Sequence, residues 1–402
     1  MEPSISSFVD RILAELDTSD PQFATVAVDR LLETGQDCAA SDLHLQPTDA
    51  GLLLRFRLDG VLQPAGTFPT SVAANIVARL KVLAELLTYR TDVPQEGRIR
   101  VAQTTVEQRV STFPTLHGER CVVRFFAGAD RFQCLDDLGM PDEIVTSLRQ
   151  NLAQTSGAIL VTGPAGSGKT STAYACLREL GQAAGVVRSL VSMEDPIEVA
   201  VPGVAQAQVN PSVDLDLARG LRFLMRQDPE VILVGEIRDR LTAEAALQAS
   251  LTGHLLLSTF HAGSAAEAVG RLSDMGIEPY LLQSGVLAIL SQRLLRRLCK
   301  CSRESDNAEA RLGLPVKSAR VPVGCPECGR TGYAGRFVLV EMLNAEPTEL
   351  GRAILSRSDA ATLQRLAVEA GMVTRWQYAC RAVEAGVTSA AEVRRVLGVS
   401  EE

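Results

Sequence analysis

The stretch Gly163-Pro164-Ala165-Gly166-Ser167-Gly168-Lys169-Thr170 fits the pattern G-x-x-x-x-G-K-[ST], which is typical of a phosphate-binding loop. The apolar run Ala158-Ile159-Leu160-Val161 before it predicts a buried strand, and the residues from Ser171 onward predict a helix. Glycines let backbone N–H groups converge without Cβ clashes, and a helix start adds a positive dipole end. In such a loop Lys169 reaches the β- and γ-phosphates, while the Thr170 hydroxyl ligates Mg²⁺. We therefore predict that residues 163–171 bind a nucleoside triphosphate with Mg²⁺.

Composition and charge restrict the class of protein. The chain has 402 residues and a net charge of −8, with 46% hydrophobic and 22% charged residues, which predicts two or three globular domains. The acidic balance disfavours a dedicated nucleic-acid binder. Residues 1–20 do not resemble a signal peptide, and no apolar run approaches the ~20 residues of a membrane span. We expect a cytoplasmic protein, and peripheral membrane association through a partner stays open.

The pattern along the chain predicts four regions. Residues 1–127 read as an α+β domain, in which 52–58 and 61–62 form a hairpin around Asp59-Gly60. Residues 128–142 are rich in turn residues and are predicted to be a linker. Residues 143–340 alternate apolar strands with helical stretches, which predicts an α/β domain with a parallel sheet. Residues 341–402 read as a helical subdomain of four short amphipathic helices.

Acidic and histidine side chains follow or flank the predicted strands of the α/β domain. Glu194 follows the strand 187–193, and Glu236 follows the strand 231–234 and Gly235. Acids at the carboxyl ends of parallel strands lie at the ligand crevice. Glu194 is thus a candidate general base for an attacking water, or else it only caps the turn before Pro196. Glu236 can hold the Mg²⁺ shell or orient water. His254 and His261 flank the strand 255–259, where they either sense the γ-phosphate or are structural.

Arginines are frequent on the predicted strands of the first domain, namely Arg98, Arg109, Arg120 and Arg124. Alone, they would indicate a solvated sheet face. Beside a phosphate-binding loop they also suit a second reading, because an arginine from another domain can stabilise the charge of phosphoryl transfer.

Two close cysteine pairs, Cys299-x-Cys301 and Cys325-x-x-Cys328, are separated by residues 302–324. Four thiolates in two pairs can form a tetrahedral Zn²⁺ site. The C-x-C pair is tighter than the usual C-x-x-C, so an unmetallated, reduced loop is the alternative. The other five cysteines are expected to be packing residues.

The combined motifs resemble the bacterial type II secretion and type IV pilus assembly ATPases (general secretion pathway protein E-like). They comprise the phosphate loop, Met193-Glu194-Asp195-Pro196-Ile197-Glu198, Arg226-Gln227-Asp228-Pro229, Val234-Gly235-Glu236-Ile237-Arg238-Asp239 and Thr252-Gly253-His254. The resemblance also covers Ala40-Ser41-Asp42-Leu43-His44 and Gln95-Glu96-Gly97-Arg98, and it extends to nearly the whole chain. Two departures are Ala165 within the loop and Phe260-His261-Ala262-Gly263, where the family usually has Leu-His-Thr-Asn.

The resemblance implies a RecA-like ATPase that works as a homohexamer. ATP would lie between the two domains, and hydrolysis would move them against each other and act on an inner-membrane platform protein. The resemblance assigns γ-phosphate contacts to Arg109 and Arg124, water activation to Glu194, the Walker B role to Glu236 and the His box to His254 and His261. The cysteine insertion favours assembly over retraction.

Three alternatives stay open at this stage: a pilus retraction ATPase, a ring ATPase that translocates nucleic acid, and a nucleotide-binding regulator without catalysis. The acidic charge argues against the second. The presence of Lys169, Glu194 and Glu236 argues against the third.

Overall fold

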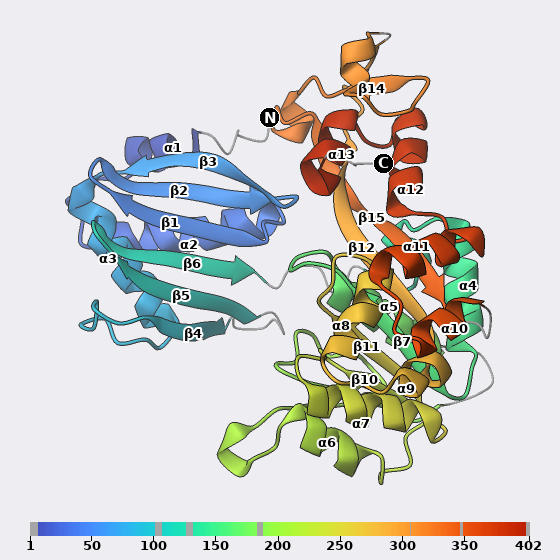
Figure 1. The fold of residues 1–402 in the computed structure, drawn as a ribbon. Coiled ribbons are helices and arrows are strands. Elements are labelled where there is room, and N and C mark those ends of the chain that lie inside the picture. The colour runs from blue at the N-terminus through green and yellow to red at the C-terminus, as the bar shows by residue number, and fades with distance from the viewer. Residues whose placement is uncertain are drawn as a thin grey trace. The chain divides into compact units, whose positions relative to one another are not determined.

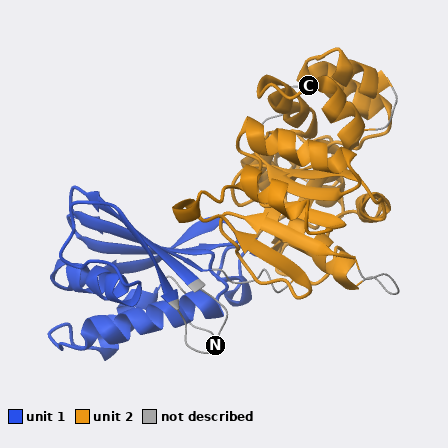
Figure 2. Cartoon of the chain, turned by 90° about the horizontal axis from the view of Figure 1, so that it is seen from below, with its two compact units in different colours: residues 1–130, 323–334 blue, residues 131–322, 335–402 orange. Residues whose placement is uncertain are grey.

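The computed structural model describes residues 7–100, 107–125, 132–182, 188–305, 307–345 and 349–398. The chain divides into two compact units, residues 1–130 with 323–334 and residues 131–322 with 335–402 (Figure 2). We describe each unit by itself. The predicted helical C-terminus, 341–402, belongs to the second unit. Residues 128–131 of the predicted linker lie outside the described part of the chain, and the other predicted boundaries stay predictions.

The first unit is built on a six-stranded antiparallel sheet with the order β3-β2-β1-β6-β5-β4 (Figure 1). Alternate residues such as Leu43, Leu45 and Val123 point to one face and pack with three helices. The opposite face carries the polar half of the alternation. The elements are α1 (Phe8–Glu15), α2 (Phe23–Asp37), β1 (Asp42–Thr48), β2 (Gly51–Leu58), β3 (Val61–Phe68), α3 (Thr70–Leu83), β4 (Gln95–Arg100), β5 (Glu107–Thr115) and β6 (Gly118–Phe125).

The predicted hairpin around Asp59-Gly60 is confirmed. Strands β2 and β3 pair up to Leu58 and Val61, so two residues form the turn. Both have positive φ, 47° at Asp59 and 82° at Gly60, as a two-residue turn matched to the strand twist requires. This local signal fixes the register of the sheet edge.

The second unit contains a seven-stranded sheet with the order β15-β12-β7-β11-β10-β8-β9. The pairs from β12 through β9 are parallel, and β7, β8, β10 and β11 are fully buried, as their continuous apolar runs predict. The predicted α/β class is therefore confirmed. The strands are β7 (Gly157–Thr162), β8 (Leu190–Glu194), β9 (Val204–Gln208), β10 (Val231–Val234), β11 (Leu255–Phe260), β12 (Val286–Leu298) and β15 (Tyr333–Asn344).

Helices cover this sheet and form the end of the chain (Figure 1). The four C-terminal helices predicted from the sequence are present. The elements are α4 (Asp142–Leu152), α5 (Lys169–Gln182), α6 (Leu217–Leu224), α7 (Arg240–Leu251), α8 (Ala265–Asp274), α9 (Pro279–Gly285), α10 (Glu349–Leu355), α11 (Ala360–Glu369), α12 (Arg375–Glu384) and α13 (Ala390–Leu397), with a small sheet of β13 (Arg303–Ser305) and β14 (Ala319–Val321). Within the described ranges, none of the helices has the length and apolar character needed to cross a bilayer.

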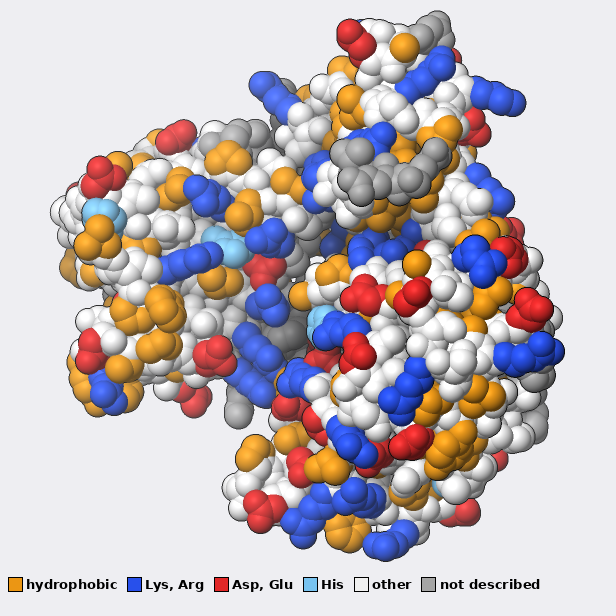
Figure 3. All heavy atoms as spheres, viewed as in Figure 1, with side chains coloured by type: hydrophobic (Ala, Val, Ile, Leu, Met, Phe, Trp, Pro, Cys, Tyr) orange, Lys and Arg blue, Asp and Glu red, His pale blue; other side chains and the backbone are white. Residues whose placement is uncertain are grey.

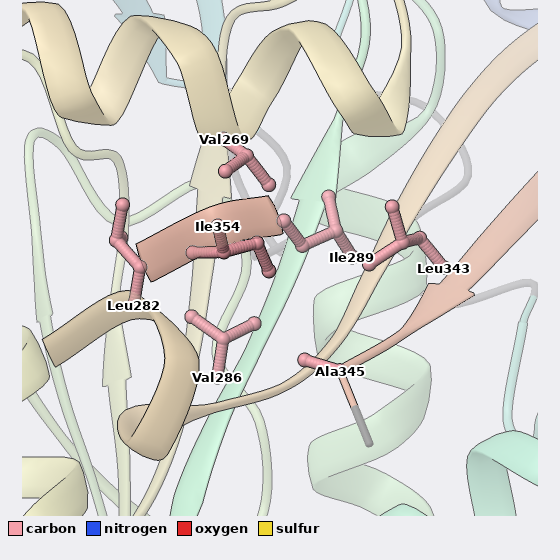
Figure 4. A pocket seen from close by; sticks show the side chains of 7 residues that line it. All are labelled: Val269, Leu282, Val286, Ile289, Leu343, Ala345 and Ile354. Atoms are coloured by element: carbon pink, nitrogen blue, oxygen red, sulfur yellow. The ribbon is translucent and has the colours of Figure 1, made fainter. Parts of the chain in front are cut away.

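A small void lies in the core of the second unit (Figure 4). Its volume is about 10 Å³, and its walls are apolar side chains that include Val269, Ile289 and Leu343. A space of this size holds at most about one water, and an apolar wall offers that water no hydrogen bond. The void is therefore a packing imperfection rather than a ligand site.

Candidate active site at the carboxyl ends of the parallel strands

The predicted phosphate loop connects the buried strand β7 to helix α5. Gly163, Gly166 and Gly168 have φ values of 152°, 72° and 87°, which side-chain-bearing residues rarely adopt. A Cβ at Gly163 would also lie 2.6 Å from the carbonyl oxygen of Gln292. The three glycines therefore suit a loop backbone that residues with a side chain would adopt only with strain.

The lysine of the loop is buried without a carboxylate hydrogen bond among the described contacts. Its Nζ donates to the carbonyl oxygens of Gly163 at 3.0 Å and Pro164 at 3.1 Å. Burial lowers the pKa of Lys169, and the charges of Glu236 and Glu198 oppose that shift. Neutral carbonyls stabilise a buried ammonium less than an anion does. Lys169 is thus a buried cation whose hydrogen bonds, among the described contacts, go to neutral carbonyls, which makes it a candidate for binding an anion.

Gln292 is a buried residue that the sequence reasoning missed, and its side chain is hydrogen-bonded to the phosphate loop. The Nε2 of Gln292, on β12, donates to the carbonyl of Ser167 at 2.8 Å, and its Oε1 accepts from the Thr172 hydroxyl at 3.0 Å. The Gln292 side chain is fully buried. The available signal was the polar run Ser291-Gln292-Arg293, which directly follows the apolar run 286–290.

Glu236 and His261 meet at the same edge of the sheet. Glu236 follows β10, and its Oε1 lies 2.6 Å from Nε2 of His261, which follows β11. Its Oε2 accepts from Nε of Arg238 at 2.5 Å, and this hydrogen bond raises the pKa of Arg238. The next helices begin at side-chain caps, Asp239 for α7 and Ser264 for α8, which fix the two loops.

His254 lies at the other end of the sheet. It precedes β11, its carbonyl accepts from the N–H of Gly157 at the start of β7, and its Nδ1 is 3.1 Å from the carbonyl of Ala249. The six residues of β11 separate it from His261, roughly 20 Å at the usual rise per residue. Only His261 therefore lies where a phosphate at the loop could reach it, because His254 belongs to the amino edge.

Glu194 is buried and held by three side chains. Ser192 Oγ donates to its Oε1 at 2.5 Å, Gln206 Nε2 donates to the same oxygen at 3.0 Å, and the Tyr174 hydroxyl donates to Oε2. Glu194 is only 3% exposed. Burial, and then the charge of Glu194, raises the pKa of Tyr174, so that this phenol remains a donor. Because the Glu194 oxygens already accept three hydrogen bonds from side chains, this carboxylate is poorly placed to accept a proton from water.

Glu198 is an exposed acid of the same segment and faces the loop. The Thr170 hydroxyl lies 3.5 Å from Glu198 Oε1, and the Glu198 N–H donates to the Tyr174 hydroxyl at 3.2 Å. Tyr174 thus connects the buried Glu194 to the backbone of the exposed Glu198. The sequence reasoning quoted Glu198 in a motif without giving it a role. Its position beside Thr170, the expected Mg²⁺ ligand, makes it a candidate for catalysis.

The arginines of the first unit form one row across the open face of its sheet. Arg109 on β5 is opposite Arg124 on β6 and also opposite Arg98 on β4. The row continues through Asp42 on β1, whose oxygens lie 3.0 Å from Arg124 Nε and 3.4 Å from Arg57 Nε. Figure 3 shows Lys and Arg side chains over β5 and β6. Neighbouring guanidinium groups can bind one phosphate together, so this row is a candidate site for an anionic ligand.

The four predicted metal ligands come together. The sulfurs of Cys299, Cys301, Cys325 and Cys328 all lie within 4.8 Å of one another. Sulfurs around a tetrahedral Zn²⁺ would be about 3.8 Å apart, given Zn–S bonds of about 2.3 Å. The Cys325 and Cys328 sulfurs are 3.7 Å apart, and the N–H of Gly332 donates to the Cys328 sulfur at 3.2 Å. The tight C-x-C spacing is therefore compatible with one tetrahedral metal site.

A larger groove of about 370 Å³ lies elsewhere on the second unit. Its wall includes Met140, Arg297, Phe337 and Arg381, and the guanidinium of Arg297 lies 5.1 Å from the centre of the Phe337 ring. No residue predicted for the nucleotide site lines this groove. Cavity size alone thus does not mark the functional site of this chain.

Replacing Gln292 with alanine should loosen the phosphate loop. The Ser167 carbonyl and the Thr172 hydroxyl would lose their buried partner, so we expect a loss of about 1–3 kcal/mol in unfolding free energy. Faster hydrogen exchange at residues 163–168 should accompany it. The control is Ser291→Ala, since the buried Ser291 hydroxyl has no hydrogen-bond partner among the described residues. Equal effects from the two variants would contradict the assigned role of Gln292.

Comparisons with known proteins agree with this geometry. Residues 17–395 match the family described as "Type II/IV secretion system protein". The chain is 43% identical over 336 residues to a putative type II secretion system protein E of Escherichia coli, covering 81% of this chain and 67% of the relative. It is 42% identical over 367 residues to the type II secretion system ATPase E of Vibrio cholerae, with 89% and 72% covered. The type IV pilus assembly ATPase PilB of Thermus thermophilus is 36% identical over 365 residues, with 88% and 41% covered.

Solved structures agree on the fold. The Legionella pneumophila ATPase DotB superimposes with a TM-score of 0.66 at 20% identity, covering 92% of this chain and 95% of DotB. The pilus retraction motor PilT with bound ADP gives a TM-score of 0.62 at 23% identity, with 91% and 95% covered. The predicted RecA-like fold is therefore confirmed. With the family match and the relatives above, the chain belongs to the type II/IV secretion system protein family.

Proposed function

We propose that this chain is an ATPase motor that drives protein secretion or the assembly of a pilus or pseudopilus. The observation that carries the proposal is the convergence of Lys169, Glu198, Glu236 and His261 at one edge of the parallel sheet. In this set Lys169 can bind the phosphates, and Glu198 and Glu236 can hold the Mg²⁺ shell or orient water. His261 lies beside Glu236. Of two relatives about 40% identical, one bears the name type II secretion system protein E and the other type II secretion system ATPase E.

We further propose a cytoplasmic homohexamer that works on an inner-membrane platform protein, with no nucleic acid involved. Family membership supports this proposal. The cysteine-rich segment bears on the direction of the motor and favours assembly over retraction. In this proposal Arg109 and Arg124 contact the γ-phosphate. The register that places Arg109 directly opposite Arg124 supports that role, because two neighbouring guanidinium groups can bind the same phosphate.

The arginine role can be tested by steady-state ATP turnover. Arg109→Ala and Arg124→Ala should each lower turnover at least about tenfold, because a positioned arginine stabilises the transition-state charge. Arg120→Ala is the matched control, since Arg120 lies on the same strand as Arg124 and is equally exposed. Equal turnover in all three variants would contradict the proposal. Turnover that rises with added DNA at low salt would instead favour a nucleic-acid motor.

Glu194 and Glu198 take different parts in the proposal. Glu198 orients the attacking water or the Mg²⁺ shell, because it faces Thr170 and is exposed. Glu194 holds Tyr174, Ser192 and Gln206 in place. The alternative from the family resemblance, that Glu194 activates the water, stays a prediction, and one pair of variants separates the two.

Glu198→Gln should keep ATP binding and lose turnover about 10²-fold or more, as expected for a general base. Glu194→Gln should lower thermal stability and change turnover less than about tenfold, because an amide replaces a buried acceptor of three hydrogen bonds. Both variants are measured for ATP affinity, turnover and melting temperature. If Glu194→Gln is stable but inactive while Glu198→Gln is active, Glu194 is the base.

We propose that the four cysteines hold one Zn²⁺ that fixes the segment between the pairs. Cys328→Ser should remove about one zinc per chain, measured by elemental analysis, and lower the melting temperature. Cys134→Ser is the control, because Cys134 is a half-buried cysteine outside the cluster. A purified chain that carries no zinc, with a melting temperature indifferent to chelators, would show that the loop is unmetallated.

A further inference from the structure

Arg293 lies beside the phosphate loop although no motif points to it. The register of β12 against β7 pairs Ser291 with Thr162, the last residue of β7. Arg293 is two positions further on, at the level where the loop begins. Gln292, which precedes it, supports the loop through Ser167. Arg293 thus lies at the carboxyl edge of the sheet, together with the loop.

The guanidinium of Arg293 is bound only by backbone carbonyls in the described contacts. Its Nη1 donates to the carbonyl of Gln292 at 3.0 Å, and its Nη2 donates to that of Gly263 at 2.9 Å. Within the described residues it forms no ion pair with a carboxylate. The two acids whose charge acts on Arg293 also have other partners: Glu267 accepts from the N–H of Gly263 at 2.7 Å, and Glu341 pairs with Arg375 at 3.3 Å.

This arrangement matches that of Lys169 on the other side of the loop. Lys169 also donates to two backbone carbonyls, at Gly163 and Pro164. Burial, with the charge of Arg375 next, lowers the pKa of Arg293 to about 10, so it stays charged at neutral pH. Its charge also lowers the pKa of Lys169. Two neighbouring cations, the buried Lys169 and the half-buried Arg293, repel each other and are stabilised when an anion binds near both.

The partner of Arg293 indicates which phosphate it would meet. Gly263 is two residues after His261, which contacts Glu236. The neighbouring carbonyl of Ala262 lies 3.4 Å from the Thr162 hydroxyl, so this turn rests on the end of β7. Arg293 is therefore hydrogen-bonded to the turn that carries His261. Through His261 this turn contacts Glu236, the acid expected near Mg²⁺ and the terminal phosphate.

We propose that Arg293 is a second phosphate-binding residue of the nucleotide site, which releases the Gln292 and Gly263 carbonyls and binds the terminal phosphate of the triphosphate. This inference rests on the proposed ATPase function. It makes Arg293 the residue of the second unit that distinguishes a triphosphate from a diphosphate, since a diphosphate lacks the group it binds.

The test compares the affinities of Mg²⁺-bound ADP and a non-hydrolysable ATP analogue by calorimetry. Arg293→Ala should weaken the analogue at least about tenfold, as expected for a lost charge-assisted hydrogen bond, and change ADP less than about twofold. Arg293→Lys should retain part of the preference, because a lysine keeps the charge but not the two-pronged geometry. Arg297→Ala, on the same strand but in the separate groove, should change neither affinity.

The possible outcomes distinguish a failure of this inference from a failure of the proposed ATPase function on which it rests. If the unmodified chain binds neither nucleotide, or Lys169→Ala binds both normally, the proposed ATPase function fails. If the unmodified chain binds both and Lys169→Ala binds neither, the function stands. In that case the inference is overturned if Arg293→Ala leaves the ratio of the analogue affinity to the ADP affinity unchanged. Arg293 would then only support the Gly263 turn. Melting temperatures of each variant show whether it is folded.

Discussion

Parallel pairing of β7, β8, β10 and β11 is the constraint on which the rest of the site depends. Parallel strands end at the same edge of a sheet, so the loops after them meet, however far apart they lie in the chain. The phosphate loop follows β7, the Glu194–Glu198 segment follows β8, Glu236 follows β10 and His261 follows β11. Without this common edge, the cations and acids of the second unit would not share one site.

In each unit, the cationic side chains of the proposed site lie close to one another. In the second unit Lys169 and Arg293 are held by backbone carbonyls. In the first unit Arg98, Arg109 and Arg124 lie in register, with Asp42 as the acid of the same row. A nucleotide bound at the proposed site would stabilise the arrangement that binds it, so ligand binding and conformation would be coupled. This coupling gives a physical basis for a machine whose conformation depends on its nucleotide.

Sequence motifs predicted the parts of the structure that depend on local backbone conformation. The glycines of the phosphate loop and the Asp59-Gly60 turn need φ values that few residues adopt, so the sequence is informative there. Partners distant in sequence could not be predicted in this way. Gln292 supports Ser167 across 125 positions. The burial of Glu194 depends on Tyr174 and Gln206, and the place of His254 depends on the direction of β11.

The most direct test of the account is a structure of the chain with Mg²⁺ and a non-hydrolysable ATP analogue. The account predicts that Lys169 leaves the carbonyls of Gly163 and Pro164 and contacts the phosphates, with Glu236 and His261 at the terminal phosphate. A nucleotide bound away from this edge of the sheet would contradict it. So would a nucleotide bound at the loop while Lys169 keeps its two carbonyl partners.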